Sequence, residues 1–209
     1  MPRGFSEIES HIIRKKLIQL GIDLFSKRGL KKTTVEELAL GAGIAKGSFY
    51  KFYPTKEALC FACLESQEKE FRENKLTPLF ESPKSRREKI HDLVTAIFTM
   101  TSTYPLIGMI LDPKEYEALL RGLPEEVLHH HKKNDEDLMS IMITELFEGN
   151  PDFKRKEITP QGLNGLFWLL ALLNIHKPEL GEAFGPATEL MANVIASGIE
   201  SVLSQEEHS

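Results

Sequence analysis

The spacing of apolar residues constrains the fold of this chain more than any other feature of the sequence. In the first segment these residues recur at steps of three and four, the period of one helix face: Ile8, Ile12, Ile13, Leu17, Leu20, Leu24 and Phe25. Later segments repeat this spacing, and none alternates apolar with polar residues as a half-buried strand does. The sequence therefore predicts an all-α fold.

Capping and breaking residues set the expected helix boundaries. Ser6 and Glu9 form a capping box before a first helix over residues 7–28, which Gly29 ends. Thr33 or Thr34 caps a short second helix, and Thr55 caps a fourth that extends to about residue 75. Prolines and glycines then bound the remaining predicted helices, which cover residues 45–52, 84–103, 113–121, 124–148, 160–176 and 186–205.

Charge is distributed unevenly along the 209 residues. The first 56 residues contain eleven Lys and Arg against five Asp and Glu, a net charge of +6, although the whole chain carries −5. A basic segment on an acidic body indicates that one end meets a polyanion. The longest apolar run, residues 166–173, is too short to span a membrane, and no secretory signal precedes it. With two cysteines and no disulfide framework, the protein is expected in the cytoplasm.

Residues 34–56 have the pattern of a helix-turn-helix. Such a unit needs a small residue where its helices cross and a glycine in the turn, and Ala39 and Gly43 supply them. The residues spaced to pack the two helices together are Leu38, Ala42, Ile44, Phe49 and Phe52. This packing leaves the polar side chains of the second helix facing outward, where a nucleic acid can reach them.

The same stretch resembles the signature of the TetR/AcrR family of transcriptional regulators. The resemblance covers about residues 8–60 and is carried by Thr33-Thr34-Val35-Glu36-Glu37-Leu38-Ala39 and by Gly43-Ile44-Ala45-Lys46-Gly47-Ser48-Phe49-Tyr50-Lys51-Phe52-Tyr53-Pro54-Thr55-Lys56-Glu57. It departs from the family at Tyr53, where phenylalanine is commoner. The resemblance implies a three-helix DNA-binding domain over residues 1–54 and a larger helical domain over 55–209 that binds an effector and dimerises.

The resemblance also implies roles for individual residues. Gly47 lets the recognition helix approach DNA closely, Tyr50 and Lys56 bind phosphates, and Thr34 offers a helix N-terminus to another phosphate. Lys46 and Ser48 reach base edges, and Lys51 serves either purpose. The expected partners are a pseudo-palindromic double-stranded DNA operator and a second copy of the chain, and family habit favours repression.

Dimerisation and effector binding are expected in the second domain. The resemblance places the dimer contact on residues 160–176 and 186–205, where apolar stripes with small residues permit close helix packing: Leu166, Leu169, Leu170, Leu173, Ala192, Ile195, Ala196, Ile199 and Val202. A pocket for a small apolar or amphipathic effector could be lined by Met139, Met142, Phe147, Phe167 and Trp168. At helical spacing these side chains also suit a plain core.

Other patterns leave rival interpretations open. Cys60 and Cys63 have redox-pair spacing, so a thiol switch or a protein partner could replace the small effector, although two small buried hydrophobes are the simpler interpretation. His129-His130-His131 cannot chelate one ion together on a helix, and we expect neither a metal nor a cofactor. No catalytic constellation is visible, so an enzyme with an appended helix-turn-helix is a remote alternative.

Overall fold

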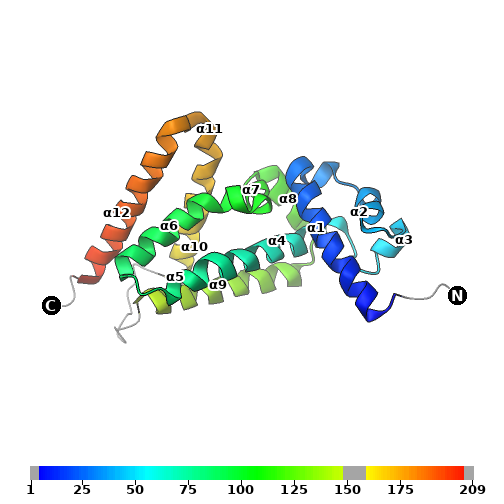
Figure 1. Ribbon diagram of the computed structural model, residues 1–209, viewed down its shortest axis with the longest axis horizontal. Helices are drawn as coiled ribbons and strands as arrows, with labels where there is room; N and C mark the ends of the chain where they lie inside the picture. Colours follow the sequence, from blue (N-terminus) through cyan, green and yellow to red (C-terminus); the bar gives the residue numbers. More distant parts are fainter. Residues whose placement is uncertain (1–4, 148–158, 205–209) are drawn as a thin grey trace. The chain divides into compact units, whose positions relative to one another are not determined.

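The computed structural model describes residues 5–147 and 159–204, and every regular element among them is helical (Figure 1). The all-α prediction is confirmed. The α-helices are α1 Glu7–Lys32, α2 Val35–Ala42, α3 Lys46–Phe49, α4 Lys56–Phe71, α5 Thr77–Glu81, α6 Arg86–Thr103, α7 Pro105–Ile110, α8 Pro113–Arg121, α9 Glu125–Phe147, α10 Pro160–Leu173, α11 Lys177–Leu180 and α12 Phe184–Ser204. A π-helical turn, Arg72–Leu76, follows α4, and 3-10 turns at Asn174–His176 and Gly181–Ala183 flank α11.

Most predicted helices are present with ends shifted by a few residues. The helices that the sequence did not indicate are α5, α7 and α11, which have five, six and four residues. Fewer than two turns give too few apolar residues to establish a period. The third helix is also shorter than expected, since it ends at Phe49 and the chain turns through Phe52.

The helices form two compact units that are discontinuous in sequence. The first comprises the residues up to Glu70 together with Tyr104–Leu128, and the second comprises Phe71–Thr103 and the residues from His129 onward. These units do not coincide with the predicted boundary between residues 54 and 55. The reason is packing: α7 and α8 both lie against α1, and they join the N-terminal helices in one unit.

The first unit has one apolar core. Its fully buried side chains come from six of its helices, α7 and α8 among them, and include Leu17, Phe25, Leu38, Phe49, Leu59, Leu106 and Leu119. The apolar face of α1 is buried only from Ile13 onward, since Ile8 and Ile12 are 75% and 48% exposed. The helix prediction for this segment is therefore right, but its first two apolar residues are not part of the core.

The second unit is organised around α6, against which α10 and α12 pack. The buried residues of α6 are Ile90, Leu93, Val94, Ile97 and Phe98. On α12 the small residues Ala192 and Ala196 are buried within the unit, 0% and 1% exposed. Their small side chains permit close helix packing inside one chain, so the part of the stripe that they form does not face outward as predicted.

A backbone kink at Gly29 shapes the end of α1. Gly29 has φ 78° and ψ 170°, so the regular helix ends where the sequence predicts and a further turn continues to Lys32. The amide of Leu30 donates a 2.7 Å hydrogen bond to the carboxylate of Glu115 on α8, and the Thr33 hydroxyl donates to the Gly29 carbonyl at 2.9 Å. A Cβ on residue 29 would lie 2.7 Å from the Glu115 Oε1 atom.

We therefore expect Gly29→Ala to lower the free energy of unfolding of the first unit by about 2 kcal/mol or more, because only glycine adopts this backbone region without strain. Gly43→Ala should cost about 1 kcal/mol, since its left-handed conformation is strained but no atom lies within 4 Å of the added Cβ. Gly47→Ala is the control, because the helical Gly47 also has open space around it. Denaturant unfolding measures all three, and equal stability of the Gly29 and Gly47 variants would contradict the kink.

Candidate nucleic-acid interface

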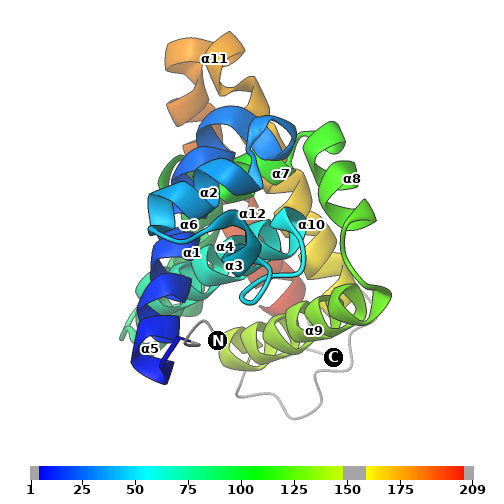
Figure 2. The same ribbon diagram turned by 90° about the vertical axis from the view of Figure 1, so that its right-hand side faces the viewer.

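Helices α2 and α3 form a tight helix-turn-helix (Figure 2). Gly43 ends α2 in the left-handed conformation, with φ 75° and ψ 30°, and its amide donates to the Leu40 carbonyl. The Ile44 amide then donates to the Ala39 carbonyl at 3.0 Å. These bonds satisfy the last carbonyls of α2 and reverse the chain within three residues. The turn glycine that the sequence singles out thus has the backbone geometry that requires it.

Aromatic side chains hold α3 against the rest of its unit. Phe49 is fully buried and Phe52 is 8% exposed. The Arg14 guanidinium of α1 lies over the rings of Phe52 and Tyr53, at 5.6 and 5.8 Å from their centroids, and donates to the Phe52 carbonyl. Partial burial raises the pKa of the Tyr53 hydroxyl. This cation-π contact fixes the end of the recognition helix, and no pattern in the sequence indicated Arg14.

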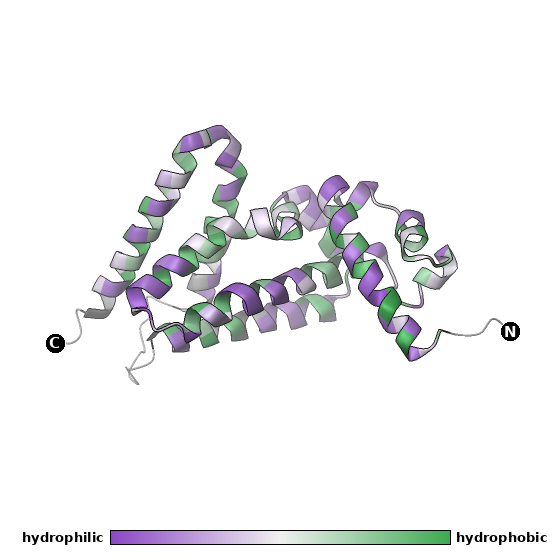
Figure 3. Cartoon of the chain, viewed as in Figure 1, coloured by the Kyte–Doolittle hydropathy of each residue, from purple (hydrophilic) through white to green (hydrophobic). Residues whose placement is uncertain are grey.

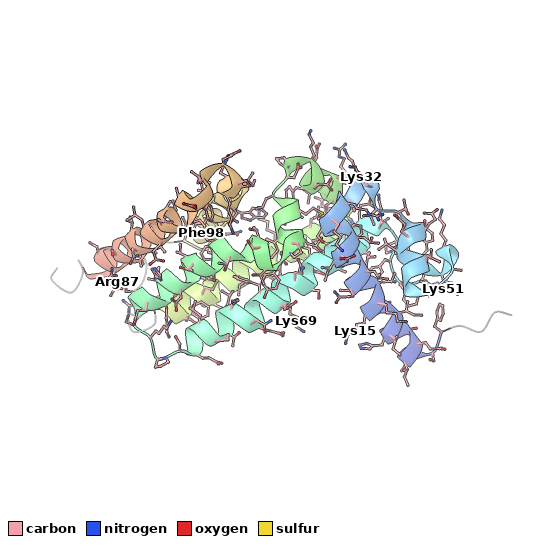
Figure 4. The ribbon with its side chains drawn as sticks, turned by 45° about the horizontal axis from the view of Figure 1, so that its top comes forward. Lys15, Lys32, Lys51, Lys69, Arg87 and Phe98 are labelled. Atoms are coloured by element: carbon pink, nitrogen blue, oxygen red, sulfur yellow. The ribbon has the colours of Figure 1, made fainter. Side chains whose placement is uncertain are left out.

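Helix α3 and the turn that follows it carry most of the residues predicted to bind DNA. Lys46, Gly47, Tyr50 and Lys51 are exposed and Ser48 is partly buried. The Tyr50 ring packs edge-on against Phe49 with centroids 5.6 Å apart, which fixes its direction. The Lys51 ammonium lies 5.8 Å above the ring of Phe5, so an aromatic residue before α1 holds this cation in place. Figure 4 labels Lys51, which lies in the turn that follows α3.

Thr34 is occupied by a capping interaction. Its hydroxyl donates to the Glu37 carboxylate at 2.9 Å and accepts from the Glu37 amide at 3.2 Å, a complete capping box. The same carboxylate forms an ion pair with Arg28 at 2.6 Å. Hydrogen bonds from Thr34 contribute most to lowering the pKa of Glu37. A phosphate contact in this region would therefore rest on the first amides of α2, which have no intrahelical acceptor, more than on the hydroxyl.

Lys56 lies in a different environment from the one that the sequence suggested. Its ammonium donates to the carbonyls of Leu30 at 2.7 Å, Thr33 at 2.9 Å and Lys31 at 3.4 Å. All of its N–H donors are therefore directed at the C-terminal turn of α1, where a cation also complements the helix dipole. The side chain ties the start of α4 to the end of α1, and a phosphate would have to displace it.

The two cysteines are packed inside the first unit. Cys60 and Cys63 are both fully buried and free. Burial raises the pKa of the Cys60 thiol to about 12 and that of Cys63 further in the same direction. A Cβ added to Gly21 would lie 2.6 Å from the Cys63 sulfur, so this small pair marks close packing of α1 on α4. Neutral, buried thiols are unreactive, which disfavours a thiol switch.

The residues predicted to line an effector pocket differ from one another in burial, where their side chains are described. Met142 is 1% exposed, Phe167 is partly buried and Trp168 is 38% exposed. The side chains of Met139 and Phe147 lie outside the described residues. A cavity of about 330 Å³ at the junction of α10, α11 and α12 has another lining, which includes Leu173, Leu180, Phe184 and Met191. Of the predicted residues with described side chains, Met142, Phe167 and Trp168 are absent from the lining of this cavity.

An apolar surface runs along α10 and α12. Leu169 and Leu172 on α10 are 64% and 37% exposed, and Leu190 and Val194 on α12 are 66% and 61% exposed. Gly165 and Gly198 share these outward faces and have open space around them. Figure 3 shows hydrophobic residues along both helices. We call this set of six residues the α10–α12 face.

Neither a metal site nor a membrane span is found in the described part of the chain. There, no three His, Cys, Asp or Glu side chains come together as a metal site would require. Within residues 5–147 and 159–204, no helix has the length and apolar composition needed to cross a membrane.

Comparisons with known proteins agree on one family. Residues 17–63 match the family model described as bacterial regulatory proteins, tetR family. The chain is 44% identical over 59 residues to the transcriptional repressor KstR2 of Mycobacterium tuberculosis, a match that covers 28% of each protein. The first curated relatives are matched over only 17–28% of their own length, so the likeness to them concerns about a quarter of this chain.

Solved structures are similar over most of the chain. A regulator of the TetR/AcrR family from Thermobifida fusca superposes with a TM-score of 0.61 at 19% identity, over 88% of this chain and 97% of that one. The regulator FadR of Bacillus subtilis, solved in complex with stearoyl-CoA, has a TM-score of 0.56 at 16% identity, over 88% of this chain and 95% of that one. These likenesses establish a shared fold.

We expect Lys56→Met to lower the stability of the first unit by roughly 1–3 kcal/mol, because it leaves the carbonyls at the end of α1 without a charged donor. Lys51→Met makes the same chemical change at an exposed position, where only the contact with Phe5 is lost. It should leave the unfolding midpoint nearly unchanged. Thermal or urea unfolding compares the two variants, and equal midpoints would show that the Lys56 contacts contribute nothing to folding.

Proposed function

We propose that this chain, whose residues 17–63 match the tetR family model, acts as a TetR/AcrR family transcriptional regulator: a homodimeric repressor that binds a pseudo-palindromic operator and is released by a small apolar or amphipathic effector. The observation that carries the DNA-binding part is the outer face of α3. There, exposed cationic and aromatic side chains project from a helix whose inner face is fixed by the buried Phe49 and Phe52. A rigid helix with a polar outer face suits the major groove.

Residues of this face divide into two proposed roles. Lys46 and Ser48, near the start of α3, reach base edges, where lysine favours the N7 and O6 acceptors of guanine. Tyr50 and the amides at the start of α2 bind phosphates, and Gly47 allows the DNA backbone to approach because no side chain stands there. Lys51 binds a phosphate from its position over Phe5. Lys56 serves as a positioning residue that orders α4 against α1.

The α10–α12 face supports the proposed homodimer. Residues of this face are more than a third exposed in the single chain, which is costly for large aliphatic side chains that recur along two helices. Its glycines permit two copies of each helix to approach closely. A second copy of the chain would remove this surface from water and carry two recognition helices, as a pseudo-palindromic operator requires.

An effector is proposed for the second unit. The FadR structure with stearoyl-CoA shows that this fold accommodates an amphipathic ligand with a long apolar chain in that protein. In this chain, Met142 and Phe167 are the proposed contacts among the described side chains. Helix α4 starts at Lys56 in the first unit, and its last residue, Phe71, belongs to the second. A ligand that binds one arrangement of this helix better shifts the population away from DNA binding.

Two other modes of control, thiol oxidation and a protein partner, have less support than a small effector. Oxidation of Cys60 and Cys63 would require a thiolate, and burial holds both thiols in the neutral form. Control by a protein partner would need a docking surface of its own, and the α10–α12 face is already assigned to the second copy. The small effector therefore remains the proposal.

For DNA binding, the purified protein should select one pseudo-palindromic sequence from a random duplex pool, with affinity that falls steeply as salt rises. Tyr50→Phe should weaken binding to all sequences alike, because it removes a phosphate contact. Lys46→Ala should relax the preference at one base pair per half-site by roughly 1–3 kcal/mol. Selection profiles of the three proteins distinguish these effects, and affinity that does not change with salt would refute the proposal.

For the dimer, Val194→Asp should yield monomers and weaken operator binding by at least tenfold, since a buried unpaired carboxylate at a two-fold interface costs more than 1.4 kcal/mol. Ile141→Asp is the matched control, because Ile141 on α9 is 57% exposed, close to the 61% of Val194. Analytical ultracentrifugation gives the oligomeric state. A Val194→Asp protein that sediments as a dimer would place the interface elsewhere.

For the effector, acyl-chain ligands should lower operator affinity, and DNA should lower their affinity by the same factor. Trp168 is the single tryptophan and lies on α10, so its emission follows ligand binding directly. Phe167→Ala should weaken the ligand if the proposed pocket is used, whereas Met191→Ala should do so if the ligand occupies the cavity beside α11. Saturating ligand without any change in operator affinity would contradict effector control.

A further inference from the structure

An ion pair joins the proposed base-reading lysine to the helix that precedes it. The Lys46 ammonium at the start of α3 contacts the Glu36 carboxylate in the first turn of α2. Both side chains are more than half exposed, 55% and 58%. The hydrogen bond between them is the main reason that the pKa of Glu36 is lowered and that of Lys46 is raised. This ion pair therefore lies on the surface that DNA would approach.

The fold does not need this pair. Exposed ion pairs contribute at most about 1 kcal/mol to stability. The cap of α2 is made by Thr34 and Glu37, and the Arg28 contact belongs to Glu37 as well. Glu36 takes part in none of these bonds that fix α2. A carboxylate beside a surface that meets a polyanion also repels it. The contact between Glu36 and Lys46 is therefore the interaction through which Glu36 can affect DNA binding.

We propose that Glu36 is a specificity-determining residue whose carboxylate competes with DNA for the Lys46 ammonium. The proposal rests on the DNA-binding role of α3 proposed above. On non-operator DNA the ammonium stays with Glu36, and the pair adds no net attraction for phosphates. At the operator a guanine presents two acceptors to the ammonium and replaces the carboxylate. Lys46 thus contributes fully to the affinity for the operator and little to the affinity for other DNA.

The competition predicts an asymmetric effect of removing the charge. With glutamine at position 36, Lys46 is free to bind any nearby phosphate, so non-operator affinity should rise by about threefold to fivefold per protomer. The logarithmic salt dependence of non-operator binding should steepen by about 0.9 per protomer, the signature of one added phosphate contact. Operator affinity should rise less, because Lys46 already leaves Glu36 there. The ratio of operator to non-operator affinity should therefore fall.

The experiment uses the full chain and four variants: E36Q, K46M, the double variant E36Q/K46M, and E117Q. Glu117 on α8 also forms an exposed ion pair, with Arg121, and E117Q changes the net charge by the same amount. Affinities are measured at several salt concentrations for the operator selected by the wild-type protein and for a scrambled duplex. Unfolding midpoints confirm that each variant is folded, as expected for exposed positions.

The result expected is a gain in scrambled-duplex affinity for E36Q that exceeds the gain for E117Q and disappears in the K46M background. An E36Q gain that persists without Lys46, or that equals the E117Q gain, reflects overall charge and overturns the proposal. A loss of operator affinity in E36Q with a changed base preference also overturns it, since Glu36 would then read a base itself. Wild-type protein that selects no sequence would overturn the proposed function first, and the role of Glu36 with it.

Discussion

The first unit depends on how the last turn of α1 is held. After the kink at Gly29, the Leu30 amide bonds to a carboxylate of α8, and the Leu30 and Thr33 carbonyls accept from Lys56 at the start of α4. The C-terminus of a helix leaves carbonyls unsatisfied, and the kink at Gly29 turns the Leu30 amide to another acceptor; here both kinds of group are bonded to charged side chains. One short segment thus joins three helices through charge-assisted hydrogen bonds. Because α2 begins two residues after this turn, its placement follows from the same bonds.

The recognition helix is held from one side only. Phe49 and Phe52 anchor it, and Arg14 lies over the aromatic residues that follow it. Only four residues are helical in α3, too few for intrahelical bonds to maintain the structure alone. Tertiary contacts therefore decide its orientation. They also leave its outer face free of structural tasks, so that polar residues there can be chosen for their interactions with a ligand.

Some of the lysines near the recognition helix are paired or used within the fold. The N-terminal 56 residues carry a net +6, yet Lys46 is paired with Glu36 and Lys56 is used within the fold. The net charge already counts Glu36 against Lys46, but fewer cations are free to contact phosphates than the eleven Lys and Arg of this segment. Non-specific affinity grows with each free cation, so internal pairing of selected lysines favours discrimination over general attraction. The same reasoning separates lysines that serve the fold from those, such as Lys51, that stand on its surface.

The sequence by itself determined the helical class, most helix boundaries, the turn glycine Gly43 and the outward set of residues on α3, because these depend on local period, capping and backbone conformation. Short helices such as α7 could not be predicted from the sequence. The occupation of Lys56, the pairing of Lys46 with Glu36, the role of Arg14 and the burial of Ala192 were decided only by the tertiary structure. Each joins residues on different helices, and no period within one segment records which side chain of another helix will lie opposite.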